Sequence, residues 1–223
     1  MKNLKRRFFI KSSSLVAGGL VLPSFNINRM ANSANNKKLK VSVVGCGGRG
    51  TGAAVQALRA DENVELVAMA DAFKDRLEKS LNAIKQEFEG EKKIEVKEKN
   101  MLVGFNGYKK AIDLADVVIL ATPPGFRPLH FKYAIDQDKH VFMEKPVATD
   151  AHGVRQVLET AKVANQKKLN VVVGLQRRYQ YSYLNILKQV RRGLIGKITS
   201  GQVRWNSSGV WVKERQPNQT EME

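Results

Sequence analysis

Short apolar runs alternate along this chain with longer stretches in which apolar residues recur at helical spacing. The runs are rich in β-branched residues and predict buried strands, whereas the amphipathic stretches predict helices. This alternation predicts an α/β fold, a doubly wound parallel sheet with helices on both faces. The stretch 91–100, rich in lysine and glutamate, has no pattern that places a strand. We expect strands at 39–44, 64–70, 116–121, 140–143 and 171–174, and helices at 53–58, 74–89 and 127–137.

The first predicted strand leads directly into a glycine-rich turn. We expect Gly45 to take a tight turn, Gly47 to let the backbone approach a phosphate, and Gly50 to let the next helix lie close to the strand. The N-terminus of that helix offers free N–H groups and a partial positive charge. The turn therefore predicts a pyrophosphate site on a Rossmann sheet, lined by Gly45, Cys46, Gly47, Gly48, Arg49 and Gly50.

An acidic residue ends the second predicted strand, 21 residues after Gly50. Asp71 at this position can accept hydrogen bonds from both hydroxyls of an adenosine ribose, and it would repel a 2′-phosphate. The acid therefore favours NAD over NADP as the cofactor. Two alternatives stay open: Arg49 and Lys74 could pair with a 2′-phosphate, and Asp71 could serve as the N-cap of the next helix.

Two later turns also follow predicted strands, at the edge where a parallel sheet presents its ligand-binding loops. Ala121, Thr122, Pro123 and Pro124 form the first, a stiff loop that suits a wall against a nicotinamide ribose. His130 lies in the next predicted helix, either in contact with substrate or cofactor or as a packing residue.

Glu144, Lys145 and Pro146 form the second turn, after the predicted strand 140–143. A cation held there by a rigid turn can hydrogen-bond a substrate hydroxyl and stabilise the alkoxide that develops during hydride transfer. A solvated surface pair of glutamate and lysine is the alternative for the same residues.

Composition excludes several classes of protein. The net charge is +17, but six of the basic residues lie in the first 31 residues, which contain no acid. The other lysines are scattered beside acids and are not interleaved with aromatic residues, so we predict no nucleic-acid binding. No apolar run approaches the roughly 18 to 20 residues of a membrane span. The single cysteine forbids an internal disulfide, and we predict no metal site.

The first 34 residues are typical of a targeting segment. They have a basic start, the pair Arg6-Arg7 followed by Phe8-Phe9-Ile10-Lys11, and a short apolar stretch over 15–22. This pattern resembles a twin-arginine export signal, and it implies a periplasmic or exported protein, with the signal either removed or retained. A basic amphipathic arm is the alternative interpretation.

Three motifs together resemble the Gfo/Idh/MocA family, named after glucose-fructose oxidoreductase, inositol dehydrogenase and rhizopine catabolism. They are the glycine turn, Ala121-Thr122-Pro123-Pro124 with the later His130, and Lys139-His140-Val141-Phe142-Met143-Glu144-Lys145-Pro146. The resemblance implies an NAD(P)-dependent oxidoreductase of a sugar or cyclitol. It also implies that Lys145 is catalytic and that Glu144 and Pro146 line the nicotinamide side.

The resemblance also divides the chain. It implies a cofactor domain over 38–175 and, over 176–223, the start of a second α+β domain that binds substrate and forms a homo-oligomer. Gln176 or Arg177, at the border, is expected to face the substrate pocket, and a surface pair of arginines, Arg177 and Arg178, is the alternative. A helix at 183–192 and one alternating strand at 197–205 are predicted next. The chain then ends before the aspartate and histidine of the family's second domain, so it resembles a truncated member.

Three functions remain open. The first is a dehydrogenase of a sugar-like hydroxyl. The second is an NAD-dependent glycoside hydrolase, in which transient oxidation of a ring hydroxyl acidifies the neighbouring C–H and elimination cleaves the glycosidic bond. The third is a nucleotide-binding module without catalysis.

Overall fold

A computed structural model describes residues 38–209, 214, 215, 217 and 219. The chain divides after Gly174 into two compact units. The predicted export signal, residues 1–34, lies outside the described residues.

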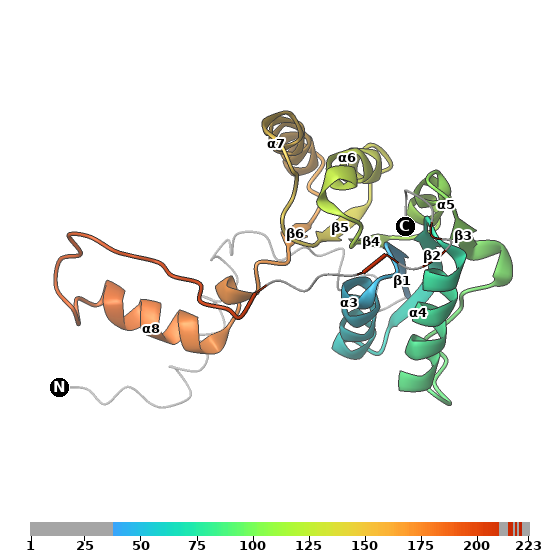
Figure 1. The fold of residues 1–223 in the computed structure, drawn as a ribbon, viewed down its shortest axis with the longest axis horizontal. Helices are drawn as coiled ribbons and strands as arrows, with labels where there is room; N and C mark the ends of the chain where they lie inside the picture. The colour runs from blue at the N-terminus through green and yellow to red at the C-terminus, as the bar shows by residue number, and fades with distance from the viewer. Residues whose placement is uncertain (1–37, 210–213, 216, 218, 220–223) are drawn as a thin grey trace, which may run out of the picture. The chain divides into compact units, whose positions relative to one another are not determined.

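The first unit is built on a six-stranded parallel sheet with the order β3-β2-β1-β4-β5-β6 (Figure 1). The central strands β1 and β4 are mostly apolar, and their residues are buried from Val41 and from Val118 onward because helices cover both faces of the sheet. The Rossmann-type α/β fold predicted from the alternating pattern is therefore confirmed. The strands are β1 (Leu39–Val44), β2 (Val64–Asp71), β3 (Met101–Val103), β4 (Val117–Leu120), β5 (His140–Met143) and β6 (Val171–Val173).

Two layers of helices enclose this sheet. Helices α3 (Gly48–Ala60) and α4 (Lys74–Glu87) pack on one face, around Leu58 and Ile84. Helices α5 (Gly107–Asp113), α6 (Arg127–Asp136) and α7 (Ala151–Gln166) pack on the other, around Phe131 (Figure 1). Along the central strand β4 alternate residues enter the two cores, as the period of two in a strand requires.

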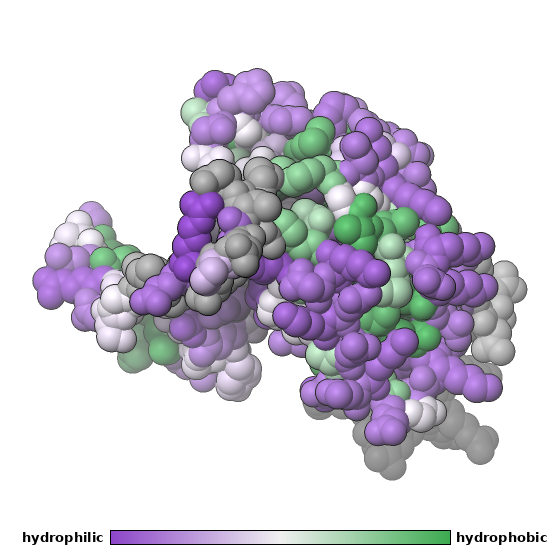
Figure 2. Space-filling view, turned by 45° about the vertical axis from the view of Figure 1, so that its right-hand side comes forward, coloured by the Kyte–Doolittle hydropathy of each residue, from purple (hydrophilic) through white to green (hydrophobic). Residues whose placement is uncertain are grey.

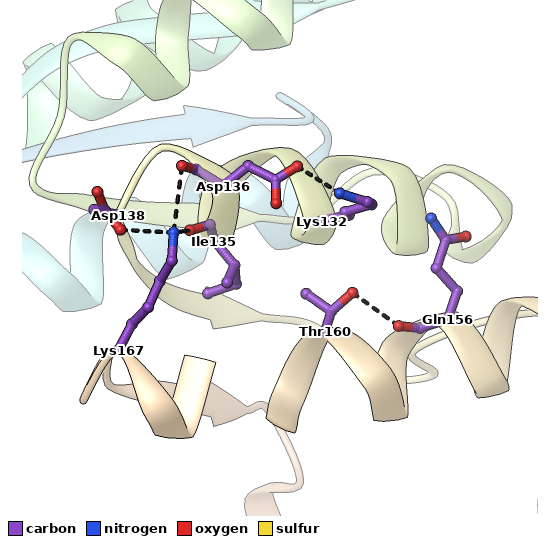
Figure 3. A network of polar contacts seen from close by, with 7 residues as sticks. All are labelled: Lys132, Ile135, Asp136, Asp138, Gln156, Thr160 and Lys167. Carbon is purple, nitrogen blue, oxygen red and sulfur yellow. Dashed lines mark hydrogen bonds and ion pairs between the residues drawn. The ribbon is translucent and has the colours of Figure 1, made fainter. Parts of the chain in front are cut away.

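One lysine joins the C-terminal ends of α6 and α7. The ammonium of Lys167 donates to the carbonyl of Ile135 at 2.9 Å and pairs with Asp138 at 2.8 Å (Figure 3). It thereby satisfies a carbonyl at the end of α6 and places a cation at the negative end of that helix. At the other end of α7, Asp150 caps the helix by accepting from the N–H of Gly153 at 2.6 Å.

The segment 91–100 adds little regular structure. Ile94 forms a parallel bridge with Leu66, and the 3₁₀ turn η1 (Glu98–Asn100) leads into the short strand β3. The apolar positions needed for a full strand are missing because lysine and glutamate occupy most of this segment.

The second unit contains the 3₁₀ turn η3 (Gln176–Arg178) and helix α8 (Tyr181–Arg191). The helix predicted at 183–192 is confirmed, with a start two residues earlier. The strand predicted at 197–205 is wrong, because these residues have no regular structure. An alternating pattern becomes a strand only when a neighbouring strand takes up its backbone N–H and C=O groups.

Hydrophilic residues occupy much of the face seen in Figure 2, and many of the exposed residues are lysines, arginines and acids. Several face acids one turn away on the same helix, for example Lys74 with Glu78 and Lys132 with Asp136. Such pairs are ordinary for solvated helix faces. In the described part of the chain, no helix has the length and apolar character that crossing a membrane requires.

Candidate functional site

The predicted cofactor residues gather at the carboxyl edge of the sheet. The chain order reverses between β1 and β4, which are neighbours in the sheet. The loops that follow these two strands separate there, and open α/β sheets bind their ligands in this crevice. The glycine turn follows β1, Asp71 ends β2, the Thr-Pro-Pro loop follows β4 and the Glu-Lys-Pro turn follows β5.

Two glycines of the turn are required by the protein's own packing. Gly45 has a φ of +97°, and a Cβ there would lie 2.5 Å from the backbone nitrogen of Thr122. At Gly50 a Cβ would lie 1.9 Å from the carbonyl oxygen of Gly45. Any side chain at Gly50 would push α3 away from the end of β1, so these two positions set the geometry of the turn.

Two other glycines of the turn are not explained by packing. Gly47 has an ordinary extended conformation, with φ of −73° and ψ of 180°, and a Cβ on Gly47 or on Gly48 would meet nothing within 4 Å. Both residues stand at the N-terminus of α3, where backbone N–H groups are free to bind an anion. The turn therefore offers an open cradle that fits a pyrophosphate.

Cys46 contributes its backbone to the turn, because its side chain points inward. The residue is 3% exposed, and its thiol donates to the carbonyl of Ala70 at 3.4 Å. Burial raises the pKa of this thiol far above its usual range, and the charge of Asp71 raises it further. The thiol is therefore protonated and inert.

Asp71 binds two backbone N–H groups. One carboxylate oxygen accepts from Cys46 at 2.6 Å and the other from Phe73 at 3.0 Å. The second contact forms an Asx turn just before α4, so Asp71 serves the helix start as well as the glycine turn. The carboxylate remains half-buried, and each oxygen has a further lone pair for a ribose hydroxyl.

Arg49 reaches away from Asp71, toward the other half of the sheet edge. Its Nε donates to the Glu144 carboxylate at 2.7 Å, which links the glycine turn after β1 to the Glu-Lys-Pro turn after β5. The Glu144 side chain is 8% exposed and that of Arg49 is 52% exposed. Gly174 leaves room for this carboxylate, since a Cβ there would lie 2.9 Å from Glu144 Oε2.

Lys145 and Pro146 are both exposed beside the buried Glu144. The peptide bond between them is cis. In the described part of the chain, no hydrogen bond or ion pair engages the Lys145 ammonium, so this cation is available at the end of β5.

His130 lies behind the Thr-Pro-Pro loop. Its Nδ1 is 3.3 Å from the hydroxyl of Thr122, and its ring packs in a tilted arrangement against that of Tyr108, with 4.2 Å between centroids. The residue is 5% exposed, and burial together with the nearby Arg127 lowers its pKa to about 4. A neutral, enclosed imidazole suits the support of Thr122 better than contact with a substrate.

Arg127 is a residue that the sequence did not single out. It is 2% exposed at the start of α6, and its guanidinium donates to the carbonyls of Thr122 and Pro146. Burial lowers the pKa of this guanidinium, while Glu144 opposes the shift. An arginine before a proline at a helix start has the appearance of a surface residue, so no sequence signal marks it.

Two aromatic side chains are exposed on the Asp71 side of this edge. Phe105 follows β3, and Phe126 lies in the 3₁₀ turn η2 (Pro124–Phe126) after the Thr-Pro-Pro loop. Their rings stack with 6.0 Å between centroids, and the residues are 54% and 40% exposed. Gly104 joins this cluster to β2 by donating to the carbonyl of Asp71 at 2.9 Å.

The predicted substrate residues Gln176 and Arg177 belong to the second unit. Both are exposed in η3, and Arg177 lies 5.2 Å from the ring of Tyr183 and 5.8 Å from that of Trp205. Their role toward a substrate stays a prediction. Among the described residues, no group of three or more His, Cys, Asp or Glu side chains could hold a metal ion.

Curated relatives include two glycosidase-type proteins. A glycosyl hydrolase family 109 protein of Solibacter usitatus is 26% identical over 210 residues, which covers 92% of this chain and 47% of that protein. An alpha-N-acetylgalactosaminidase of Shewanella oneidensis is 27% identical over 227 residues, covering 92% of this chain and 46% of that protein. The chain thus spans about half the length of these relatives.

Solved structures with the same fold include two inositol dehydrogenases. The scyllo-inositol dehydrogenase from Lactobacillus casei, with bound NAD(H) and scyllo-inositol, is 24% identical with a TM-score of 0.58, over 73% of this chain and 44% of that chain. The myo-inositol 2-dehydrogenase from Lactobacillus plantarum is 28% identical with a TM-score of 0.58, over 73% and 43%.

The model of an oxidoreductase family with an NAD-binding Rossmann fold matches residues 39–175, more than half of the chain. This range contains the glycine turn, Asp71, the Thr-Pro-Pro loop and the Glu-Lys-Pro turn. The chain therefore belongs to the GFO/IDH/MocA oxidoreductase family, and residues 39–175 match its NAD-binding Rossmann fold.

Proposed function

We propose that this chain holds NAD(H) at the carboxyl edge of its sheet, for hydride transfer to or from a sugar or cyclitol hydroxyl. The open cradle at Gly47 and Gly48 is the observation that supports this most strongly. Both glycines lie at the N-terminus of a helix, and neither is needed by the protein's own packing. A ligand that approaches the backbone closely explains them, and a pyrophosphate suits the free N–H groups.

The position of Asp71 and two ion pairs favour NAD over NADP. Asp71 presents a carboxylate where a 2′-phosphate would have to lie. Arg49 is already paired with Glu144 on the opposite half of the edge, at 2.7 Å. Lys74, the other candidate cation, lies 3.6 Å from a carboxylate oxygen of Glu78. We therefore propose that neither Arg49 nor Lys74 offsets the repulsion between Asp71 and the 2′-phosphate of NADP.

The adenosine end of the cofactor would lie on the Asp71 side. Phe105 and Phe126 expose apolar ring surface next to this strand end, and an adenine base can stack on such surface. The nicotinamide end would then lie near Thr122 and Lys145, where the loops after β4 and β5 meet.

Lys145 is proposed as the catalytic cation. When bound, the nicotinamide accepts or donates the hydride. The Lys145 ammonium would donate a hydrogen bond to the substrate oxygen and stabilise the negative charge that develops on it. Pro123 and Pro124 would exclude water from this side of the site, because they stiffen the loop and present no N–H donor.

A polyol or sugar is the substrate class that the comparisons support. Two structures with this fold are inositol dehydrogenases, whose substrates carry a ring of secondary hydroxyls. Because the chain spans about half the length of its curated relatives, the substrate and the turnover belong to this proposal for the whole protein.

Glycoside hydrolysis with a retained cofactor is the second candidate, and the two glycosidase-type relatives favour it. Transient oxidation of a ring hydroxyl by bound NAD⁺ would acidify the neighbouring C–H, and elimination would cleave the glycosidic bond. Addition of water to the resulting double bond and return of the hydride to the ketone would complete the hydrolysis and restore NAD⁺. Release of the chromophore from nitrophenyl glycosides without net formation of NADH would support this candidate. Net formation of NADH with a polyol would support the dehydrogenase.

Fluorescence titration of the 223-residue chain with NADH and NADPH tests the proposal. We expect saturable binding that is tighter for NADH. Lys145→Ala should bind NADH like the parent chain. In the whole protein, if it oxidises a polyol, the same variant should abolish that oxidation. Failure of a folded chain to bind either dinucleotide would refute cofactor binding by this unit alone. Binding without reaction on any polyol or glycoside would favour a nucleotide-binding module.

A further inference from the structure

Two arginines hold the residues on either side of Lys145. Arg49 pairs with the side chain of Glu144 at 2.7 Å, and Arg127 donates to the backbone carbonyl of Pro146. The lysine between them is exposed and makes no hydrogen bond or ion pair with any described residue. The place of its ammonium is therefore set by the backbone of the Glu-Lys-Pro turn.

Arg127 also holds the neighbouring loop. The same guanidinium donates through its second terminal nitrogen to the carbonyl of Thr122. Strands β4 and β5 are paired up to Leu120 and Met143, so the two loops leave the sheet side by side. Because a guanidinium is rigid and planar, its two contacts fix the distance between the Thr-Pro-Pro loop and the Glu-Lys-Pro turn.

The burial of this arginine is unusual for a residue that only supports the fold. Arg127 is 2% exposed, and its Nε–H has no partner among the described residues. Burying a cation is unfavourable unless its donors are satisfied, and here only two carbonyls and the nearby Glu144 compensate. Both carbonyls belong to the loops that flank the proposed nicotinamide site.

We propose that Arg127 is a positioning residue for Lys145, which it keeps at a fixed place relative to Thr122 by tying the two loops together. The inference rests on the proposed function in assigning Lys145 to catalysis. Because Arg127 is buried, it acts through the backbone of the turn and not by contact with a substrate.

Three variants of the 223-residue chain test this role. Arg127→Lys keeps the charge but cannot span both carbonyls, and Arg127→Met removes the charge at similar volume. Arg155→Met is the matched control, since Arg155 is exposed on α7 and has no hydrogen bond or ion pair among the described residues. Each variant is measured for its melting temperature, for NADH affinity and for the ¹³C signal of reductively methylated Lys145, assigned with Lys145→Arg.

We expect both Arg127 variants to bind NADH about tenfold more weakly while still folded, because they release the Thr122 carbonyl and loosen the loop that flanks the proposed nicotinamide site. This loss does not come from Lys145, which is not needed for NADH affinity. The chemical shift and titration of Lys145 should move in both, and Arg155→Met should match the parent. An unchanged Lys145 signal in both variants would overturn the proposal, whatever happens to the NADH affinity or the melting temperature. Loss of the fold in both variants would also overturn it, because Arg127 would then be a stability residue. If the parent binds no NADH, the proposed function fails, and the Lys145 signal alone decides the role of Arg127.

Discussion

The carboxylate of Asp71 accepts a hydrogen bond of 2.6 Å from the backbone N–H of Cys46. The acid at the end of β2 is thereby tied to the glycine turn that follows β1. Because Gly104 also donates to the carbonyl of Asp71, three loops meet at this residue. The proposed ribose site and the proposed pyrophosphate site therefore share one rigid anchor.

Asp71→Asn should change the preference between the two dinucleotides. The amide keeps one acceptor oxygen but loses the negative charge that binds ribose hydroxyls and repels a 2′-phosphate. We expect NADH affinity to fall about tenfold, as for one lost hydrogen bond to a charged group, while NADPH affinity stays level or rises. Fluorescence titration with both dinucleotides measures the ratio.

Asp75→Asn is the control for this change of charge. Asp75 lies in the first turn of α4, is exposed, and faces Lys79 at 3.5 Å. The ratio of NADH to NADPH affinity should stay at the parent value. An equal shift in both variants would point to long-range electrostatics and contradict a specific role of Asp71.

Two glycines of the turn should respond in opposite ways to the same substitution. Gly50→Ala places a Cβ 1.9 Å from the carbonyl oxygen of Gly45, so we expect it to destabilise the fold by about 3 kcal/mol. Gly47→Ala meets no atom within 4 Å, and its effect on stability should stay within about 0.5 kcal/mol. If Gly47 faces a pyrophosphate, the same variant should weaken NADH binding about tenfold or more.

Urea unfolding and NADH titration together check this pair. Gly52→Ala, one turn into α3, is the control, because its Cβ would meet only the end of the Arg49 side chain, at 3.8 Å. We expect Gly52→Ala to stabilise the helix by up to about 1 kcal/mol without weakening NADH binding. Parent-like NADH binding by Gly47→Ala would show that the cradle is not used.

Five of the six strands and the loops that follow them were predicted from the sequence because their signals are local, whereas the short strand β3 (Met101–Val103) was not predicted. A β-branched run before a glycine turn requires no knowledge of distant residues, and Gly45 and Gly50 adopt the geometry that the motif predicts. Asp71 at the end of β2 was predicted in the same way, from its distance of 21 residues after Gly50 in the sequence.

Contacts between distant segments could not be predicted in this way. The pairing of Arg49 with Glu144 joins two loops on different strands, and the burial of Arg127 depends on where the Pro146 carbonyl lies. The alternating pattern over 197–205 predicted a strand. Such a pattern shows only that one face of a strand would be apolar, and it does not show which strand would pair with it.

Lys167→Met should lower stability without affecting the cofactor site. The ammonium holds the end of α6 through Ile135 and pairs with Asp138 (Figure 3). These residues precede β5 and β6, so they lie at the opposite edge of the parallel sheet from the glycine turn, which follows β1. Loss of a cation at a helix C-terminus costs about 1 kcal/mol. Lys162→Met is the control, since its pair with Glu159 is well exposed and should contribute little. Equal urea midpoints for the two variants would contradict the role given to Lys167.

His130 should make the stability of the fold depend on pH between about 6.5 and 4. Burial, helped by Arg127, lowers its pKa in the native state to about 4, whereas the unfolded chain has the ordinary value of about 6.5. The unfolded state therefore binds more protons in this window. The contribution of neutral His130 to the free energy of unfolding is therefore fully present above about pH 6.5. On the order of 3 kcal/mol of it is lost as the pH falls to 4.

Urea unfolding at a series of pH values, for the parent and for His130→Gln, isolates this contribution from that of the carboxylates. The glutamine does not titrate, so the variant should be less stable at neutral pH but should lose less stability on acidification. His152→Gln, at an exposed position of α7, should follow the parent. If His130→Gln and the parent lose stability equally between pH 6.5 and 4, His130 is not held neutral behind Thr122, and its imidazole is open to solvent or to a ligand.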